Sequence, residues 1–409
     1  MGYTFNIHVP MPHTDRIDPS EQDIIIVGAG PAGISTALHL AIMAPELIAR
    51  TLILEKARHP RPKLCGGGLL PDAEAVLADL GLDVTEIPHV DVDWAHFNFA
   101  GRGMRMRAEK NGNYAFRTIR RHEFDAWLAS RAREIGFRIL EDTSVESIAV
   151  SESGVSVATN GGEYRAKIVV GADGSNSLIR RSIIPREEVH VARLLEVVTE
   201  SLAKNDLPDQ SESTFDFAVL TQGIQGYVWD FPALENGKPA RVRGIYDANI
   251  LKVKTRLPLR AGLEADLARH GLSLSEYRLE GHPLRWFDSR QAFSAPRLLL
   301  VGDAAGADAL FGEGISIALG YGRIAARAIQ EAYSNQDFSF RFYKRSLLQA
   351  ALGKALQRRT WFARFFYWLR FAPFQMFLWR RMGWLIEWAM RAFFIGWARQ
   401  QKASDKKKG

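Results

Sequence analysis

The stretch Asp23-Ile24-Ile25-Ile26-Val27-Gly28-Ala29-Gly30-Pro31-Ala32-Gly33 decides the fold. Its first half is a run of β-branched residues, which predicts a short strand buried on both faces. Its second half is a G-x-G-x-x-G turn, and residues 34–43 after it form an Ala- and Leu-rich run typical of a helix. Strand, glycine turn and helix in this order predict a dinucleotide-binding unit, whose pyrophosphate meets unpaired N–H groups at the helix N-terminus.

The residues of this turn have separate expected roles. Gly28 permits the tight turn, Gly30 lets the backbone approach the pyrophosphate, and Gly33 lets the helix pack on the strand. Residues 51–54 predict a second strand, which ends at Glu55 and Lys56. Glu55 is placed to hydrogen-bond the ribose hydroxyls, so the sequence predicts a nucleotide site that the turn and Glu55 share.

Three later segments distinguish FAD from NAD. The segment Arg120-Arg121-His122-Glu123-Phe124-Asp125 is expected to open a helix, with arginines where a phosphate can be met. Residues 145–150, 154–159 and 164–170 alternate as an antiparallel meander that runs into Asp173-Gly174. Residues 297–301 predict a buried strand that ends at the Gly302–Gly306 turn, and Gly312-Glu313-Gly314-Ile315 opens another helix.

In this order and at these separations, the segments resemble the flavin-containing hydroxylase superfamily. The resemblance implies an α/β, FAD-binding Rossmann-type fold with an antiparallel-sheet substrate domain. It also implies that Asp303 binds the ribitol hydroxyls and that the helix after Gly314 faces the flavin pyrimidine. The family usually has a proline where this chain has Ala309, a departure that concerns the rigidity of the loop near the flavin. The residues expected to bind FAD are Gly28, Gly30, Pro31, Ala32, Gly33, Glu55, Lys56, Cys65, Gly66, Gly68, Arg121, Val145, Asp173, Gly174, Asp303, Gly312, Gly314 and Ile315.

Two further segments narrow the family. Pro62-Lys63-Leu64-Cys65-Gly66-Gly67-Gly68 matches the K-x-C-G-G-G signature of the geranylgeranyl reductase group. Tyr227-Val228-Trp229-Asp230-Phe231-Pro232 matches the Y-x-W-x-F-P signature of archaeal members that saturate prenyl chains of lipids. With the flavin motifs, the resemblance covers roughly residues 20–335. It implies that isolated C=C bonds are reduced in the prenyl chain of a lipid or of an isoprenoid diphosphate.

The same segments supply the catalytic and substrate candidates. Three glycines after Cys65 let backbone lie flat against a planar ring, which places Cys65 beside the isoalloxazine. Cys65 and Tyr227 are the catalytic candidates, and Tyr227, Trp229, Phe231 and Pro232 are the expected substrate residues. A buried cysteine is otherwise a small hydrophobe, and alternating aromatics otherwise form core. Residues 241–245 replace the asparagine-glycine pattern of archaeal members, which leaves the lipid head group open.

Composition limits the other classes of site. The 409 residues include one cysteine, so a disulfide framework and a cysteine-cluster metal site are not expected. Residues 1–20 have no apolar segment typical of a secretory signal, so we expect a cytoplasmic location.

We expect FAD-binding segments at residues 20–95, 121–190 and 291–335, substrate-domain segments at 96–120 and 191–290, a helical region at 336–401 and a disordered tail at 402–409.

The carboxy-terminal segment carries much of the net charge of +7. Residues 361–397 are rich in Trp, Phe and Arg, with Glu387 as the one acid, and arginines interrupt every apolar run before the roughly 20 residues needed to span a bilayer. Trp and Arg at this density favour peripheral contact with the cytoplasmic face of a membrane. Pro373 is expected to break the segment into two helices. The alternative to membrane contact is that these two helices are buried against the catalytic lobe or a partner subunit. Nucleic acid binding is not expected.

We therefore predict an FAD-dependent prenyl reductase, reduced by NAD(P)H or by a small electron-transfer partner. Two other functions share the scaffold: an FAD monooxygenase or halogenase acting on an aromatic or lipophilic substrate, and a non-catalytic flavin-binding partner at the membrane. Fold alone does not separate them, since function depends on the site.

Overall fold

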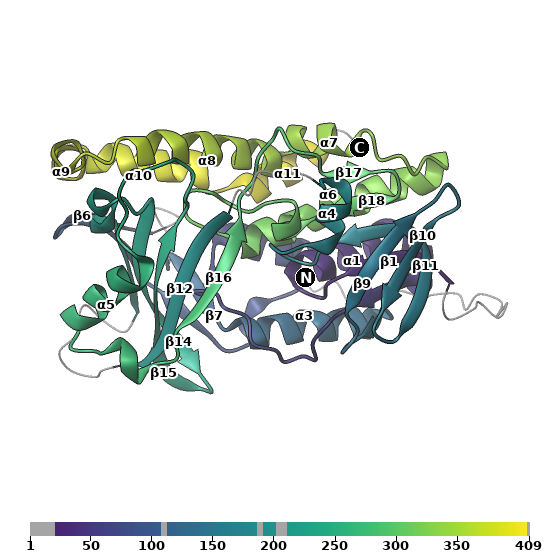
Figure 1. Ribbon diagram of the computed structural model, residues 1–409, viewed down its shortest axis with the longest axis horizontal. Coiled ribbons are helices and arrows are strands. Elements are labelled where there is room, and N and C mark those ends of the chain that lie inside the picture. The colour runs from purple at the N-terminus through teal and green to yellow at the C-terminus, as the bar shows by residue number, and fades with distance from the viewer. Residues whose placement is uncertain (1–20, 108–112, 186–190, 202–210, 407–409) are drawn as a thin grey trace.

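The computed structural model describes residues 21–107, 113–185, 191–201 and 211–406. Two large sheets lie end to end, and a layer of helices runs along the top of both (Figure 1). The eight-stranded sheet, on the right, has the path β17-β18-β11-β1-β2-β8, and β10 and β9 extend it from β11. Its strands are β1 (Glu21–Val27), β2 (Thr51–Leu54), β8 (Arg138–Leu140), β9 (Val145–Val150), β10 (Val155–Thr159), β11 (Gly162–Gly171), β17 (Ser294–Ala295) and β18 (Leu298–Leu300).

Parallel pairing forms the centre of this sheet. β1 pairs in parallel with β11 and β2, and β18 adds to β11 in parallel. The predicted meander is present, since β9, β10 and β11 pair antiparallel in sequence order. The carboxyl ends of β1, β2 and β18 consequently meet at one edge of the sheet, where ligands bind in open α/β folds.

The second large sheet has seven strands in the order β16-β12-β15-β14-β13-β5-β6. The strands are β5 (Trp94–Phe99), β6 (Arg102–Met106), β12 (Val191–Glu200), β13 (Glu212–Asp216), β14 (Gly226–Glu235), β15 (Lys238–Asp247) and β16 (Glu280–Arg285). A small sheet of β3 (Gly68–Leu69), β7 (Phe116–Ile119) and β4 (His89–Val92) lies beside β14. Because side chains alternate along a strand, β14 turns Tyr227, Trp229 and Phe231 to one face.

The helices divide between the two lobes and the layer above them. Helix α5 covers the other face of the seven-stranded sheet, where Val197, Ile245 and Leu263 form a separate core. The helices are α1 (Pro31–Met43), α2 (Pro71–Asp79), α3 (Arg121–Ile135), α4 (Leu178–Ile183), α5 (Leu259–Arg269), α6 (Ile315–Asn335), α7 (Tyr343–Gln349), α8 (Ala351–Trp368), α9 (Ala372–Arg381), α10 (Gly383–Phe394) and α11 (Trp397–Lys406).

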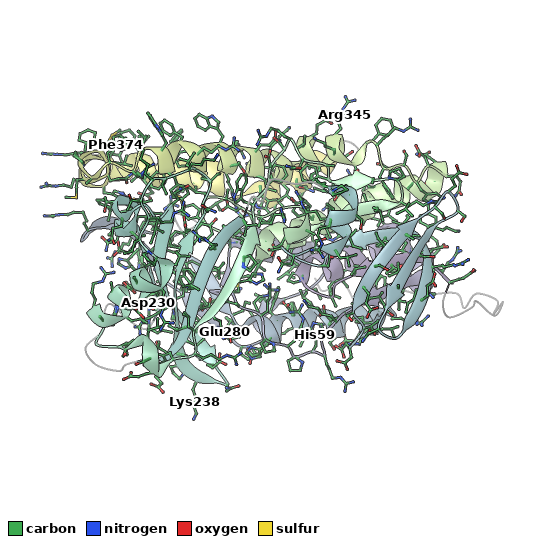
Figure 2. All side chains as sticks on the ribbon, viewed as in Figure 1. His59, Asp230, Lys238, Glu280, Arg345 and Phe374 are labelled. Atoms are coloured by element: carbon green, nitrogen blue, oxygen red, sulfur yellow. The ribbon has the colours of Figure 1, made fainter. Side chains whose placement is uncertain are left out.

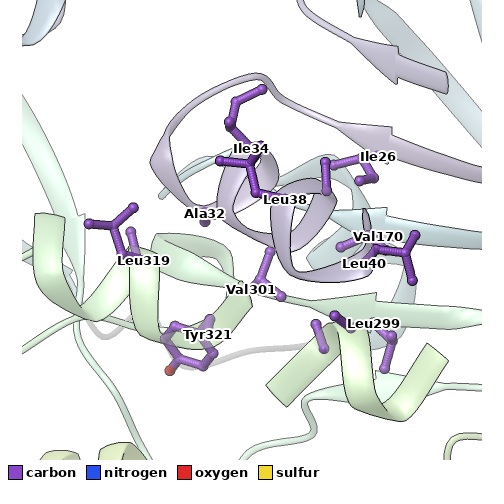
Figure 3. Close-up of a cluster of buried hydrophobic side chains, with 14 of the residues drawn as sticks. Ile26, Ala32, Ile34, Leu38, Leu40, Val170, Leu299, Val301, Leu319 and Tyr321 are labelled. Carbon is purple, nitrogen blue, oxygen red and sulfur yellow. The ribbon is translucent and has the colours of Figure 1, made fainter. Parts of the chain in front are cut away.

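Helices α1 and α6 pack closely against each other in the core of the nucleotide-binding lobe. Figure 3 shows Leu38 of α1 and Leu319 of α6 among the packed apolar side chains of this core. The hydroxyl of Ser35 donates to the Leu319 carbonyl at 2.6 Å. A Cβ at Gly322 would stand 2.4 Å from Ser35 Oγ, so the crossing requires glycine there. This packing fixes the N-termini of the two helices side by side.

The helical layer differs from the sequence prediction in two respects. Pro373 lies in the first turn of α9, and residues 361–397 hold the end of α8, all of α9 and α10 and the start of α11, so the prediction of two helices is wrong. The tail predicted from residue 402 is helical as far as Lys406, because α11 is anchored: Asp72 of α2 accepts the N–H groups of Gly396 and Ala398 at 2.9 Å each. Residues 407–409 lie outside the described residues.

This layer is apolar on both faces. Ala363, Tyr367 and Trp379 are buried against the substrate lobe, whereas seven large side chains are exposed on α8, α9, α10 and the turn before α9. The exposed side chains are Trp361, Phe365, Trp368, Phe371, Phe377, Trp384 and Trp388. Within the described residues, every helix is too short or too polar to cross a membrane.

Candidate functional site

A cavity of about 720 Å³ joins the two lobes. Its lining comes from the Gly28 turn, the loop around Cys65, the aromatic face of the seven-stranded sheet and the start of α6. Met390 of α10 and Ile395 bring the helical layer to the same cavity. One continuous space thus connects the predicted nucleotide site with the predicted substrate wall.

The glycine turn has the geometry that its sequence predicts. Gly28 has φ +108°, and a Cβ there would stand 2.4 Å from the Ala172 carbonyl oxygen. A Cβ at Gly33 would stand 2.0 Å from the Gly28 carbonyl oxygen. Gly28, Gly30, Pro31 and Ala32 line the cavity, whereas Gly33 serves the packing of α1 on the turn. A backbone without side chains at the N-terminus of a long helix fits a pyrophosphate.

Glu55 follows β2 directly and binds the turn that follows β1. Its carboxylate accepts the N–H of Ala29 at 2.9 Å and lies 3.3 Å from Nε of Arg61. Arg61 also reaches Asp125 at 3.4 Å, and Asp125 holds Arg121 through two bonds of 2.7 and 2.9 Å. Glu55 retains acceptor capacity toward the cavity, and the buried chain of alternating charges holds both arginines in place.

Asp303 and Asp173 have different surroundings. Asp303 lines the cavity, accepts the Ser175 hydroxyl at 3.4 Å and stands 3.7 Å from the Cβ position of Gly314, just before α6. Asp173 accepts the hydroxyl of Ser177 and the N–H groups of Leu178 and Ile179, so its carboxylate caps α4. Asp303 is therefore the carboxylate available to a ribitol chain, and Asp173 shapes the loop beside it.

The loop around Cys65 reaches under the cavity. Gly67 has φ +79°, and a Cβ there would stand 2.1 Å from the Ile119 carbonyl oxygen. A Cβ at Gly66 would stand 3.1 Å from Nε1 of Trp229. Burial raises the pKa of the Cys65 thiol, with Arg121 opposing that effect. The glycines thus permit close approach of backbone to the aromatic wall, and the thiol keeps its proton at neutral pH.

Lys63 of this loop forms a cationic contact that sequence reasoning missed. Its Nζ lies 2.7 Å from Nε2 of His282, which can accept that bond because burial and Lys63 lower the pKa of His282 to about 4. Burial lowers the pKa of Lys63, and Asp303 opposes that effect. The pair places a hydrogen-bond donor beside the expected flavin position.

The aromatic wall is built from neighbouring strands. Phe97 stacks on Phe215 with ring centroids 4.7 Å apart, and Phe215 contacts Phe231 at 5.0 Å. A Cβ at Gly244 would stand 2.2 Å from Cζ2 of Trp229, so glycine is required there for the indole to lie over β15. Tyr227, Trp229 and Phe231 line the cavity as predicted, but Pro232 falls on the alternate face of β14 and is outside the lining.

The unusual segment 241–245 turns its arginines away from this wall. Arg241 and Arg243 both pair with the buried carboxylate of Asp230, on the α5 face of the sheet. Only Gly244 of the segment acts on the cavity, through the space that it leaves for Trp229. The arginines that replace the asparagine-glycine pattern therefore form buried ion pairs on the α5 face of the sheet and do not line the cavity.

Three tyrosines hold the loop in which Ala309 replaces the family proline. Tyr246 donates to the Ala309 carbonyl at 3.1 Å, Tyr367 to that of Leu310, and Tyr227 to that of Phe311 at 2.5 Å. The Asp308 side chain accepts the N–H groups of Leu310 and Phe311, and Arg359 of α8 lies 3.6 Å from it. These bonds supply the rigidity that the missing proline would give.

The same contacts bear on Tyr227 as a catalytic candidate. Its proton is directed at a backbone carbonyl, and burial raises its pKa far above the usual value. Tyr227 therefore contributes a ring to the wall and a bond to the loop.

Most predicted site residues meet at the cavity. Gly33 and Pro232 do not line it; the remainder do, including Lys56, Gly68, Val145, Gly174, Gly312 and Ile315. The residues that sequence reasoning missed include Arg61, His282 and Arg359, which come from distant segments and belong to no motif. Lys63 could have been predicted from the sequence, since it is the first residue of the K-x-C-G-G-G signature. Among the described residues, no group of three or more His, Cys, Asp or Glu is placed to hold a metal ion.

Comparison with known proteins agrees with this geometry. A family model described as "FAD binding domain" matches residues 21–245. Digeranylgeranylglycerophospholipid reductase 1 of Methanopyrus kandleri is 30% identical over 347 residues, which are 80% of this chain and 84% of the relative. Relatives from Thermoplasma acidophilum and Methanococcus aeolicus have the same name at 26% and 27% identity.

Solved structures share the fold. A protein from Thermoplasma acidophilum described as geranylgeranyl bacteriochlorophyll reductase-like superposes with a TM-score of 0.74 at 21% identity, covering 94% of this chain and 99% of that one. The halogenase PltM superposes with a TM-score of 0.68 at 16% identity, covering 95% and 84%. The chain thus has the flavin hydroxylase-like fold, which reductases and halogenases both use.

Proposed function

Because the chain belongs to the FAD-binding domain family and to its geranylgeranyl reductase group, we propose that this FAD-dependent oxidoreductase saturates isolated C=C bonds in the prenyl chain of a lipid or of an isoprenoid diphosphate. NAD(P)H or a small reduced electron carrier supplies the electrons. The relatives named for digeranylgeranylglycerophospholipids support this class of substrate.

The single observation that carries the proposal is the continuous cavity. One end has the Gly28 turn, Glu55 and Asp303, which fit a dinucleotide, and the other end is a wall of aromatic side chains. The charges on the loop beside that wall are internally paired, since Arg359 holds Glu313 at 2.6 Å and Asp308 at 3.6 Å. An apolar chain meets no unpaired charge from these three groups.

The residues have distinct proposed tasks. Gly28 and Gly30 hold the pyrophosphate, Glu55 the ribose, and Asp303 the ribitol, while the backbone of Gly66 to Gly68 approaches the ring. Bound FAD, once reduced, supplies the hydride. Since an isolated alkene has no polar handle, the shape of the aromatic wall must orient it, and a protein group must deliver a proton to the second carbon.

Product analysis in air tests the reaction type. Purified protein with FAD, a reductant and a geranylgeranyl lipid is expected to yield products heavier by two hydrogens for each bond reduced. Incorporation of oxygen, or of halide when it is supplied, would instead identify a monooxygenase or halogenase on the same fold. Flavin that no reductant bleaches would identify a non-catalytic flavin protein.

The helical layer supports a peripheral membrane location. Trp361, Trp384 and Trp388 are exposed by 67%, 68% and 55%, and Arg380 and Arg381 beside them are exposed too. Indole rings and arginines suit the head-group region of an anionic bilayer. Met390 of α10 lines the cavity, so the exposed layer and the apolar wall share an element. We propose that the prenyl chain enters from an anionic membrane surface at this layer.

Vesicle flotation tests this docking. Arg381→Gln is expected to reduce flotation with anionic vesicles, because each basic residue near an anionic surface contributes about 1 kcal/mol. Trp384→Ser is expected to reduce it too, because the indole ring suits the head-group region. Arg345→Gln is the matched control. Arg345 is exposed on α7, away from the exposed Trp and Phe side chains of α9 and α10 (Figure 2). Activity on a detergent-solubilised short-chain substrate should survive in all three. Unchanged flotation would make the layer a packing element only.

A further inference from the structure

Two small side chains line the cavity where the rest of its wall is bulky. Ala95 on β5 and Ala115, just before β7, both line the cavity and are 4% and 3% exposed. Beside them the wall is aromatic: Phe215 on β13 pairs with Trp229 on β14 and with Phe97 on β5. The proposed function gives the two alanines no task, so the space that they leave calls for an explanation.

Ala95 belongs to the row of side chains next to these aromatics. Ser213 on β13 pairs with Ala95, and Ala95 pairs with Met106 on β6. Side chains two residues apart on a strand share a face, so this row follows the row of Phe215 and Phe97 on the same side of the sheet. Ser213 is small and fully buried. Across β13, β5 and β6, this row therefore has one bulky side chain, that of Met106.

The row of Ala95 lies at the end of its strands opposite the helical layer. Phe217, just after β13, contacts Phe366 of α8 and Trp379 of α9, with ring centroids 5.8 and 5.5 Å apart. Ser213 comes four residues before Phe217, which is about 13 Å along a strand. The hairpin of β14 and β15 marks this other end of the strands and lies at the bottom of Figure 1, with the helical layer at the top. A prenyl chain that enters from the layer therefore passes the aromatic rows before it reaches Ala95.

The Cys65 loop, beside which the alkene lies in the proposed reaction, faces a different strand from Ala95. A Cβ at Gly66 would stand 3.1 Å from Nε1 of Trp229 and 3.2 Å from Cε2 of Phe231, so this loop faces β14. β5 is two strands from β14 in the sheet, about 10 Å at the usual strand spacing, which is the length of about two isoprene units. The cavity thus extends past the reacting bond as far as Ala95.

Ala115 closes the same end of the cavity from the small sheet. Its N–H donates to the carbonyl of Val92 at 2.6 Å, and Val92 ends β4 three residues before Ala95. Phe116, which follows it, contacts Phe231 with ring centroids 5.3 Å apart. Among the described residues, β5, β6 and β7 contribute only apolar side chains to the lining, which suits a hydrocarbon chain.

We propose that Ala95 and Ala115 set how much of the prenyl chain can extend past the reacting bond. The inference rests on the proposed function, because it concerns the same cavity. The end of the chain farthest from the head group enters first. A bond near the head group therefore reaches the Cys65 loop only when the leading part of the chain lies against the two alanines. Larger side chains there would leave the leading bond reducible and keep the bonds near the head group out of reach.

Binding of two glycerol ethers, one with a geranyl and one with a geranylgeranyl chain, tests this proposal. Calorimetric titration of the FAD-loaded protein in detergent measures both affinities. Ala95→Leu should weaken binding of the geranylgeranyl ether at least tenfold, or about 1.4 kcal/mol, and should leave binding of the geranyl ether unchanged. The head group stays at the mouth of the cavity, so only the longer chain reaches the new side chain.

Ala240→Leu is the matched control. Ala240 lies on β15 of the same sheet and is 6% exposed, but it is outside the cavity lining. Both substitutions add the same volume to the buried part of one sheet, so a general effect of overpacking appears in both. The control should leave both affinities unchanged.

The position of the reduced bonds gives a second measurement. Ala95→Leu should still saturate the bond farthest from the head group, and it should leave the bond nearest the head group intact where the wild-type protein reduces it. Fragment masses of the product distinguish the two bonds. Ala115→Val adds a smaller volume at the same end and should shift binding and products in the same direction, which keeps the test available if Ala95→Leu does not fold.

The outcomes separate this proposal from the proposed function. Equal loss of affinity for both ethers in a folded variant would overturn the proposal, as would unchanged binding of the geranylgeranyl ether. A wild-type protein that saturates the chain, with variants that do not discriminate between the two lengths, would retain the proposed function and reject the role of the alanines. A wild-type protein that binds neither ether would reject both.

Discussion

Replacing Glu196 by glutamine should change how stability depends on pH. Burial in the folded state raises the pKa of Glu196 from 4.5 to about 8. Between these values the folded protein keeps a proton that the unfolded chain has lost, so stability falls as the pH rises. Each pKa unit corresponds to about 1.4 kcal/mol, so the loss from this one carboxyl between about pH 5 and about pH 8 is about 4 kcal/mol.

Glutamine cannot titrate, so the variant should gain stability relative to the wild-type protein by about 1.4 kcal/mol per pH unit through this window. Urea unfolding of both proteins, saturated with FAD, at several pH values measures the difference. Other titrating groups act on both proteins and cancel, provided that FAD affinity is measured to be equal. A difference that stays constant with pH would refute the argument, since Glu196 would then be ionised throughout.

Three further predictions concern the cavity. Glu55→Ala and Asp303→Ala should each weaken FAD binding by about 1.5–3 kcal/mol, measured by titration of flavin fluorescence, since each removes a charge-assisted hydrogen bond; undiminished affinity in both would reject these assignments. Cys65→Ala should retain FAD and slow product formation at least tenfold, which needs only about 1.4 kcal/mol of barrier; wild-type turnover contradicts that. Tyr227→Phe should cost about 1 kcal/mol of unfolding free energy by losing the bond to the Phe311 carbonyl, and its turnover should fall less than tenfold; a hundredfold loss would make Tyr227 the acid.

The sequence predicted the nucleotide-binding lobe well because local patterns determine it. The β-branched run, the glycines at fixed offsets and the meander from Val145 each depend on neighbours along the chain. Gly28 and Gly33 have no room for a side chain in the structure, which is the physical reason for the motif. The cavity lining at Cys65 and Trp229 was predicted by resemblance to a family.

The remaining features depend on contacts between distant segments. Glu196 belongs to no motif, and it is buried only because β12 lies inside the seven-stranded sheet, between β16 and β15. The hydrogen bonds that hold the Ala309 loop come from tyrosines of β14, β15 and α8, and no local sequence pattern relates these three residues. The tail prediction from residue 402 was wrong as far as Lys406, since composition does not reveal that Asp72 binds the N–H groups of Gly396 and Ala398 at the start of α11.

In the proposed reaction this chain transfers a hydride and a proton to an isolated alkene. A single turnover without oxygen tests it most directly: protein with chemically reduced FAD is mixed with a geranylgeranyl lipid, and absorbance and lipid mass are followed together. We expect the flavin to reoxidise as the lipid gains two hydrogens, at equal rates and in equal amounts. Flavin that stays reduced until oxygen is admitted, with the lipid mass unchanged, would contradict it.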